Sequence, residues 1–318
     1  MQNYIMRRVL LLIPTIILVT IIVFFLVRFI PGDVIDVMMA EQQAFGHTEI
    51  DRDELVKRLG LDVPIFIQYG RWVAEIFRGN LGDSLWSSES VVEALRTRLP
   101  VSLELGLIAI IIGQLVAIPI GILSAIRQDT PQDYVGRILA ILFLCLPNFW
   151  LGTLVMVYPS IWWHWAPPLQ YIPLAQDPLG NLGMFIIPGA IMGLHASGSS
   201  MRMTRTMMLE VMRQDYIRTA WSKGLSEKVV IIRHALKNAL IPVVTMIGIS
   251  LPVVIAGTVI MENIFALPGM GRLTLEALTK RDYAMVSGIN LFFAGFVMLV
   301  NLGVDLSYAF LDPRIHYK

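Results

Sequence analysis

The sequence predicts an all-α integral membrane protein with six transmembrane helices and a small helical insertion after the first. Three observations predict this class. First, 56% of the 318 residues are hydrophobic and only 15% are charged, whereas soluble domains carry about 25% charged residues. Second, the apolar residues form long unbroken blocks, each close to the roughly 20 residues that a helix needs to cross a bilayer. Third, Lys and Arg gather in alternate short loops between the blocks, as in multi-span proteins. The long segment 31–99 is the exception, with seven Lys or Arg, but long loops translocate largely regardless of charge.

The apolar blocks predict spans at about 9–30, 100–124, 138–163, 185–207, 239–261 and 286–310. The first block follows two arginines, as in a signal peptide, but its apolar run from Val9 to Val27 is too long, and no small-residue cleavage site follows. We therefore expect a retained span. The predicted domains are 1–98 (first span and insertion), 99–311 (the other five spans with the loop 210–237) and 312–318 (C-terminal tail).

The basic residues predict the orientation of the chain. Loop 210–237 carries six Lys or Arg, and the same side holds Arg127 and Arg137, whereas 164–184 has none and 262–285 has three. Arg7 and Arg8 at the start, and Arg314 and Lys318 at the end, lie on the richer side. Because short cytoplasmic loops are enriched in Lys and Arg, both termini are expected in the cytoplasm. Trp162, Trp163 and Trp165 then mark the outer interface of the third span.

The insertion 31–99 contains helix start and stop signals. Asp51 and Asp62 are candidate N-caps, Pro64 fits a first turn, and Gly60 and Gly79 fit positions just past helix ends. The second predicted helix has one apolar face, made of Ile65, Tyr69, Trp72 and Ile76. We expect this face to pack on the spans or on the bilayer surface; the alternative is a docking surface for a soluble binding protein.

Several residue types inside the spans affect helix packing. Gly and Ser in 193–200 should let helices approach closely. The single cysteine, Cys145, is interpreted as a small core residue. Proline occurs in each of the first five spans and tends to kink its helix: Pro14, Pro119, Pro147, Pro188 and Pro252.

The sequence lacks the motifs of several protein classes. It has no phosphate-binding loop of the G-x-x-x-x-G-K-[ST] type, and no G-x-S-x-G, H-E-x-x-H or C-x-x-C motif. We therefore predict no catalytic residue and no metal site in this chain. The net charge of +1 gives no basic field for nucleic acid. Glu104, His195 and Asp305 are ionisable residues inside the spans, too scattered to make a good proton relay.

Loop 210–237 contains the strongest functional signal. Met208, Met212, Tyr216 and Ala220 recur every four residues, which predicts one helix continuing out of the fourth span. Gly224 fits a left-handed position after a helix, and Ser226 can cap a second helix. On that second helix, one face is expected to hold Leu225, Val229, Ile232 and Leu236.

Amphipathic basic helices have two physical uses. Such a hairpin can lie on the membrane surface as an interfacial helix. It can equally insert its apolar face into a groove on a cytoplasmic partner. The residues of the loop do not by themselves decide between these uses.

Motifs along the whole chain resemble one family. The loop resembles the EAA-type loop of ATP-binding-cassette (ABC) importer permeases, and more narrowly the first of the two permease subunits of the dipeptide/oligopeptide/nickel family. The matching runs are 215–225, 233–242, Arg28-Phe-Ile-Pro-Gly-Asp33, Leu59-Gly-Leu-Asp62, Asn80-Leu-Gly-Asp83, Met203-Thr-Arg205, 262–272, Arg281-Asp-Tyr283 and Asp312-Pro-Arg-Ile315. Four positions depart from the general pattern: Arg218 and Thr219 replace Glu and Ala, Lys237 replaces a proline, and Val34 stands where a second proline is frequent.

The resemblance implies a type I ABC importer permease fold in the cytoplasmic (inner) membrane of a prokaryote. It implies three kinds of partner besides the lipid bilayer: a second, homologous permease subunit forming a heterodimer, two ABC ATPase subunits, and an extracytoplasmic solute-binding protein. No cofactor is implied in this chain, because ATP and magnesium would be held by the ATPases. The contact with the ATPases is expected at Asp215, Arg218, Thr219, Ala220, Lys223, Gly224 and Leu225.

The resemblance predicts import of peptides or a related small solute, with the partner ATPases driving alternating access. Solutes of the family include peptides, nickel, glutathione and oligosaccharides. The solute path is expected among the polar residues of the spans, namely Gln114, Asn148, His195, Thr245, Ser250 and Asn290. The alternative is an ion-coupled secondary transporter or channel that acts without an ATPase, which explains the spans but not the loop. An intramembrane enzyme built on His195 and Asp305 is the weakest interpretation.

Overall fold

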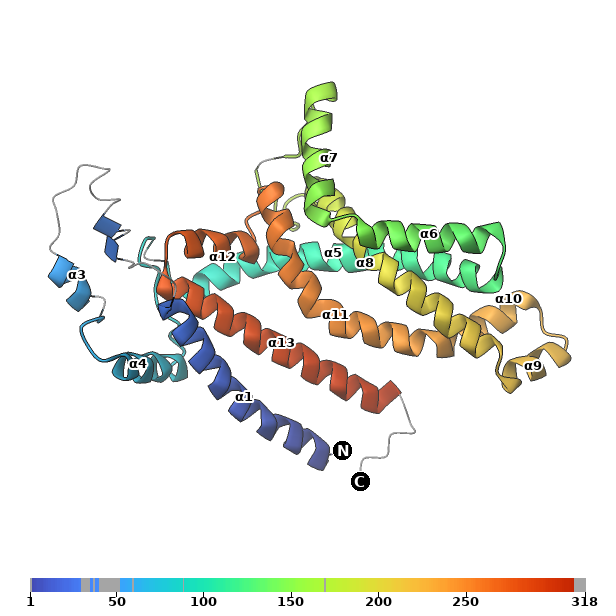
Figure 1. Cartoon of the computed structure of the whole chain (residues 1–318), viewed down its shortest axis with the longest axis horizontal. Helices are drawn as coiled ribbons and strands as arrows, with labels where there is room; N and C mark the ends of the chain where they lie inside the picture. The colour runs from blue at the N-terminus through green and yellow to red at the C-terminus, as the bar shows by residue number, and fades with distance from the viewer. Residues whose placement is uncertain are drawn as a thin grey trace. The chain divides into compact units, whose positions relative to one another are not determined.

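The computed structural model describes residues 2–29, 35–36, 38–39, 52–58, 60–87, 89–168 and 170–311, and these are almost entirely helical (Figure 1). Five described helices are long and apolar enough to cross a membrane, and a bent pair can supply a sixth. The all-α membrane class is therefore confirmed, with five candidate spans, or six if the bent pair forms one. The long helices are α1 (Gln2–Arg28), α5 (Val91–Ile126), the pair α6 (Pro131–Cys145) and α7 (Asn148–Trp163), α8 (Pro178–Met212), α11 (Lys237–Ile264) and α13 (Tyr283–Leu311). The short ones are α3 (Arg52–Arg58), α4 (Ile65–Phe77), α9 (Asp215–Ser222), α10 (Glu227–Val229), the π-helix η1 (Val230–Leu236) and α12 (Met270–Thr279).

The predicted third span is two helices, because α6 and α7 meet at an angle of 86°. Leu146 is extended at the break, with ψ 115°, and Pro147 follows it. Proline lacks a backbone N–H and disfavours the helical region for the residue before it, which explains the break. The prolines at 14, 188 and 252, by contrast, lie inside continuous helices.

The described chain divides into two compact units, Met1–Pro100 with Gly269–Leu299, and Val101–Pro268 with the end of α13. In the first unit, α4 packs on α1. The Tyr69 hydroxyl lies 3.0 Å from Thr20 Oγ1, and the Trp72 and Phe24 ring centroids are 5.6 Å apart. The prediction that the apolar face of this helix packs on a span is thus confirmed.

The ends of the short helices in the insertion follow most of the sequence signals. Gly60 and Gly79 have φ values of +63° and +82° just past α3 and α4, as predicted. The cap assigned to Asp62 is wrong: Pro64 occupies the N-cap position of α4, and no side chain caps it. Asp62 lies two residues too early to reach the first free amides of the helix. Asp51 lies outside the described residues.

In the second unit, α8 packs on α6 and α11 (Figure 1). The predicted close approach of small residues is confirmed: a Cβ atom on Gly193 would stand 2.5 Å from the Ala109 carbonyl oxygen of α5, and one on Gly198 would stand 2.5 Å from the Ala140 carbonyl oxygen of α6. The core assignment of Cys145 is wrong, because this residue is exposed. The buried positions of α6 form one stripe, and Cys145, five residues after Ala140, falls outside it.

Candidate coupling site

The hairpin begins with a break rather than with a continuous helix. Helix α8 ends at Met212, Gln214 is extended with ψ 149°, and α9 starts at Asp215 (Figure 1). The predicted continuation of the fourth span through Ala220 is therefore wrong. An acidic residue is favourable in the first turn of a helix, and Asp215 takes that place in α9.

An apolar seat fixes α9 to the rest of the unit. Ile217 and Ala220, on one face of α9, are 0% and 5% exposed. They pack in a cluster with residues of α5, α8, η1 and α11. Its other buried members are Ala125, Met208, Val230, Ile231, Ala235 and Ala239. A helix of eight residues is too short to be stable alone, so this burial holds α9 in place.

The opposite face of α9 is exposed. Five of the seven residues predicted for ATPase contact are exposed: Asp215, Arg218, Thr219, Lys223 and Gly224. The other two are not: Ala220 lies in the apolar seat, and Leu225 is half-buried against it. They position the helix instead of presenting a surface.

Two exposed aromatic residues, to which the sequence assigned no binding role, flank the buried face of α9. Tyr216 and Trp221 are each 42% exposed. The Tyr216 hydroxyl accepts a hydrogen bond of 2.8 Å from Asn238 Nδ2, which joins α9 to the start of α11. Large aromatics on an exposed helix between basic residues are a signal of a binding surface, because Trp and Tyr dominate interface energetics.

The turn after α9 follows the prediction, and the second arm does not. Gly224 has φ +74° and lies just past the end of α9, as expected. Val229 and Ile232, predicted to share a face with Leu225 and Leu236, are exposed, whereas Leu225 and Leu236 are half-buried. The buried residues are Val230 and Ile231 instead. The reason is η1, since wider π-helical turns shift the buried face away from that of a regular α-helix. Ser226 is the N-cap of α10, but its side chain makes no capping hydrogen bond.

A buried ion pair lies one helical turn from the seat of α9. Arg205 of α8 donates two hydrogen bonds to the Asp133 carboxylate of α6, of 2.8 and 2.7 Å. The Ser124 hydroxyl of α5 donates to the same carboxylate, and so does the Asp129 amide at 3.1 Å. The Asp133 side chain is 0% exposed and that of Arg205 is 19% exposed. Arg205 lies in one of the motif runs, but the sequence does not reveal its role, because its partner Asp133 is 72 residues away.

Four of the six polar residues predicted for the solute path have hydrogen-bond partners within their own helix or on a neighbouring one. Gln114 donates to Ser200 at 3.2 Å, and a ring nitrogen of His195 lies 3.1 Å from the Phe143 carbonyl oxygen. Ser250 and Asn290 bond carbonyl groups of their own helices. Asn290 belongs to the first unit and the other five to the second, and no described contact joins all six. The side chain of Asp305 lies outside the described residues. The path therefore stays a prediction.

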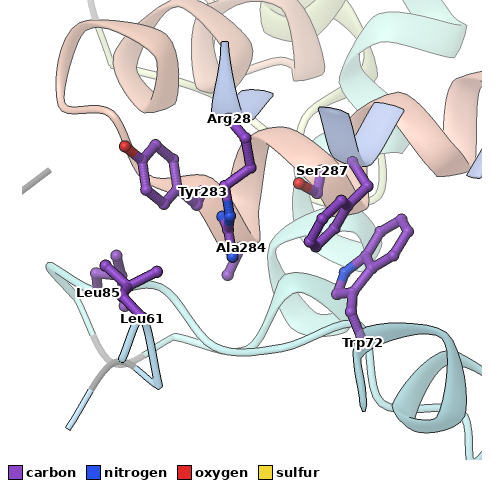
Figure 2. A pocket seen from close by; sticks show the side chains of 8 residues that line it. Arg28, Leu61, Trp72, Leu85, Tyr283, Ala284 and Ser287 are labelled. Atoms are coloured by element: carbon purple, nitrogen blue, oxygen red, sulfur yellow. The ribbon is translucent and has the colours of Figure 1, made fainter. Parts of the chain in front are cut away.

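Motif residues of the first unit meet in a separate pocket (Figure 2). The Arg28 guanidinium lies over the rings of Phe24 and Tyr283, at 4.8 and 5.0 Å from their centroids. It donates to Gln68 Oε1 at 2.8 Å. Arg28 and Tyr283 thus join two motifs that are distant in sequence, and they do so inside the packed unit. This pocket contains none of the predicted coupling residues.

Comparison with known proteins decides the family. Residues 117–317 match the family described as binding-protein-dependent transport system inner membrane component, and residues 1–106 match its N-terminal membrane component family. The chain belongs to this permease family. It is a permease subunit of an ABC importer, so the alternative of an ion-coupled carrier or channel acting alone is rejected.

Full-length relatives agree with this assignment. A protein of Brucella suis biovar 1 (strain 1330), provisionally named a peptide transport system permease protein, is 40% identical to the permease over 317 residues, covering 100% of both chains. The dipeptide transport system permease protein DppB of Escherichia coli (strain K12) is 37% identical over 341 residues, again covering 100% of both. A crystal structure of an amino acid ABC transporter with histidines shares the fold: the TM-score is 0.53 at 13% identity, covering 69% of this chain and 94% of that one.

Proposed function

We propose that this permease moves peptides into the cytoplasm by alternating access, and that the exposed face of α9 receives the driving motion from partner ATPases. The observation that carries the proposal is the two-faced character of α9. One face is buried through Ile217 and Ala220, and the far side of the helix exposes Arg218. Tyr216 and Trp221 are exposed on the two flanks of the buried face. A rigidly seated helix with an exposed aromatic and basic face can transmit force from a partner that grips it.

The partners follow from the family. A binding-protein-dependent system supplies solute from an extracytoplasmic binding protein, and we expect a second permease subunit and two ATPases to complete the assembly. ATP hydrolysis would then belong to the ATPases, consistent with the absence of a phosphate-binding loop from the sequence. The six Lys and Arg residues of 210–237, compared with none in 164–184, support a cytoplasmic position for α9 and for both termini.

The solute class rests on the relatives. Two of them, from Escherichia coli and Pseudomonas aeruginosa, are named as dipeptide and di/tripeptide permeases, at 37% and 35% identity over their full length. Ligand identification on the cognate binding protein would test this class directly. Co-purified nickel or an oligosaccharide, with no peptide, would contradict it.

The coupling role of α9 can be tested with surface variants. Trp221→Ala should lower the recovery of ATPase subunits with the tagged permease about tenfold, since a central aromatic anchor carries much of the energy of an interface. Trp163→Ala is a matched control, because this tryptophan is 70% exposed at the far end of α7. Recovery should be unchanged in the control.

A second experiment tests energy coupling itself. Replacing the phosphate-binding-loop lysine of the partner ATPases should stop concentrative uptake, because ATP would no longer drive the permease. Undiminished uptake in that strain, or undiminished ATPase recovery with Trp221→Ala, would overturn the proposal.

A further inference from the structure

The buried ion pair and the seat of α9 form one continuous structure. Ser124 and Ala125 are neighbours on α5, and Arg205 and Met208 are one helical turn apart on α8. Ser124 and Arg205 bond Asp133, while Ala125 and Met208 are buried against α9 in the apolar cluster. Whatever displaces α9 must therefore displace the groups that hold Asp133.

Glycine contacts on both sides of the ion pair make this region stiff. A Cβ atom on Gly121 of α5 would stand 2.7 Å from Thr204 Cβ of α8, and one on Gly136 of α6 would stand 3.3 Å from Ser124 Cβ of α5. Three helices thus converge on one carboxylate with backbone-close packing. Closely packed helices of this kind shift as a body rather than bend.

The carboxylate itself is fully satisfied. It accepts two hydrogen bonds from Arg205, one from Ser124 and one from the Asp129 amide, and Arg137 lies 3.5 Å away. A bidentate guanidinium–carboxylate pair fixes angle as well as distance. The Asp129 amide comes from the turn between α5 and α6, where Asp129 has φ +59°. The pair therefore ties α8 to both the α6 helix and its preceding turn.

We propose that Asp133 and Arg205 form a clamp that makes α5, α6 and α8 move together with α9, and that breaking it separates ATP hydrolysis from transport. Both are positioning residues. This inference rests on the proposed coupling role of α9. A buried ion pair adds little to stability compared with apolar packing, so geometric specification is the better account of its presence.

The test uses the complete transporter in proteoliposomes, measuring ATP hydrolysis, solute uptake and the recovery of ATPase subunits. Asp133→Asn keeps the shape and the Ser124 contact but removes the charge. We expect hydrolysis and recovery within about twofold of the native complex and uptake about tenfold lower, since coupling free energies between sites commonly correspond to factors of this size. Arg205→Lys should retain more uptake than Arg205→Gln.

Two further variants distinguish loss of the ion pair from misfolding of the chain. Arg205→Gln removes the bidentate partner of a buried carboxylate and leaves only Arg137 at 3.5 Å. Asp133→Asn/Arg205→Gln is therefore included as a neutral pair, and it should be no worse than the more damaged single variant. Arg202→Gln is the control on the same helix, because Arg202 is exposed. It should behave as the native chain.

The outcomes separate this inference from the proposed function. If uptake, hydrolysis and subunit recovery fall in parallel, the pair is only structural and the clamp is rejected. If uptake is unchanged in Asp133→Asn, the clamp is likewise rejected. If the coupling role of α9 itself is wrong, the Trp221→Ala variant should recover the ATPase subunits normally.

Discussion

Gly113 of α5 and Gly193 of α8 lie backbone against backbone. A Cβ atom on Gly113 would stand 2.8 Å from the Gly193 carbonyl oxygen, and one on Gly193 would stand 3.0 Å from the Gly113 amide nitrogen. Such an approach is possible only without side chains, and it sets the crossing point of two long membrane helices. The crossing lies in the same unit as the coupling site.

Gly193→Val is expected to destabilise the permease by about 1–3 kcal/mol, because the added atoms cannot be accommodated against backbone. Thermal unfolding of the purified chain in detergent measures this effect. Gly183→Ala is the control on α8, where a Cβ atom would have nothing within 4 Å. Equal unfolding temperatures for the two variants would refute the close approach.

Substitutions of Gly224 are expected to lower solute uptake to different degrees. Its φ of +74° is disfavoured for other residues, while the space around it is open, so backbone strain and not collision decides the outcome. We expect uptake to fall in the order Asn, Ala, Val, since Asn tolerates the left-handed region and the cost for other residues is about 1–2 kcal/mol. Uptake is compared at equal membrane levels. Full activity of Gly224→Val would show that transport does not depend on the left-handed backbone at this position.

Truncation of the Ile217 side chain is expected to destabilise α9 locally. This side chain is 0% exposed in the seat of α9. Ile217→Ala should cost about 2–5 kcal/mol and loosen α9. Hydrogen exchange of the α9 amides is the measurement, and Val229→Ala, at a position 37% exposed, is the control. Unchanged exchange in Ile217→Ala would mean that other contacts hold the helix.

The proposed orientation of the chain predicts opposite labelling of two positions. In a Cys145→Ser background, a cysteine replacing Ser222 should react with an impermeant maleimide only after the cells are permeabilised. One replacing Asn80 should react in intact cells. Both native residues are exposed, so access depends on the side of the membrane. Labelling of Ser222→Cys in intact cells would reverse the topology.

Much of the fold could be predicted because its signals are local. Apolar blocks give the spans, and glycines at 60, 79 and 224 give the helix ends, since both depend on residues near each other in sequence. The errors also have physical causes. The break at Gln214 and the π-helical turns of η1 interrupt a helical period that the sequence continues smoothly. Exposure of Cys145 depends on which stripe of α6 meets its neighbours.

The sequence by itself determined the class, the spans, the family resemblance and the position of the loop that carries α9. Hydrophobicity and helix-end residues act over a few turns, so they can be read from neighbouring residues. The tertiary structure alone decided which face of α9 is free and which residue Arg205 pairs with. Those features need α5, α6 and α8 to converge within a few ångströms, and residues 72 positions apart meet only when the helices pack.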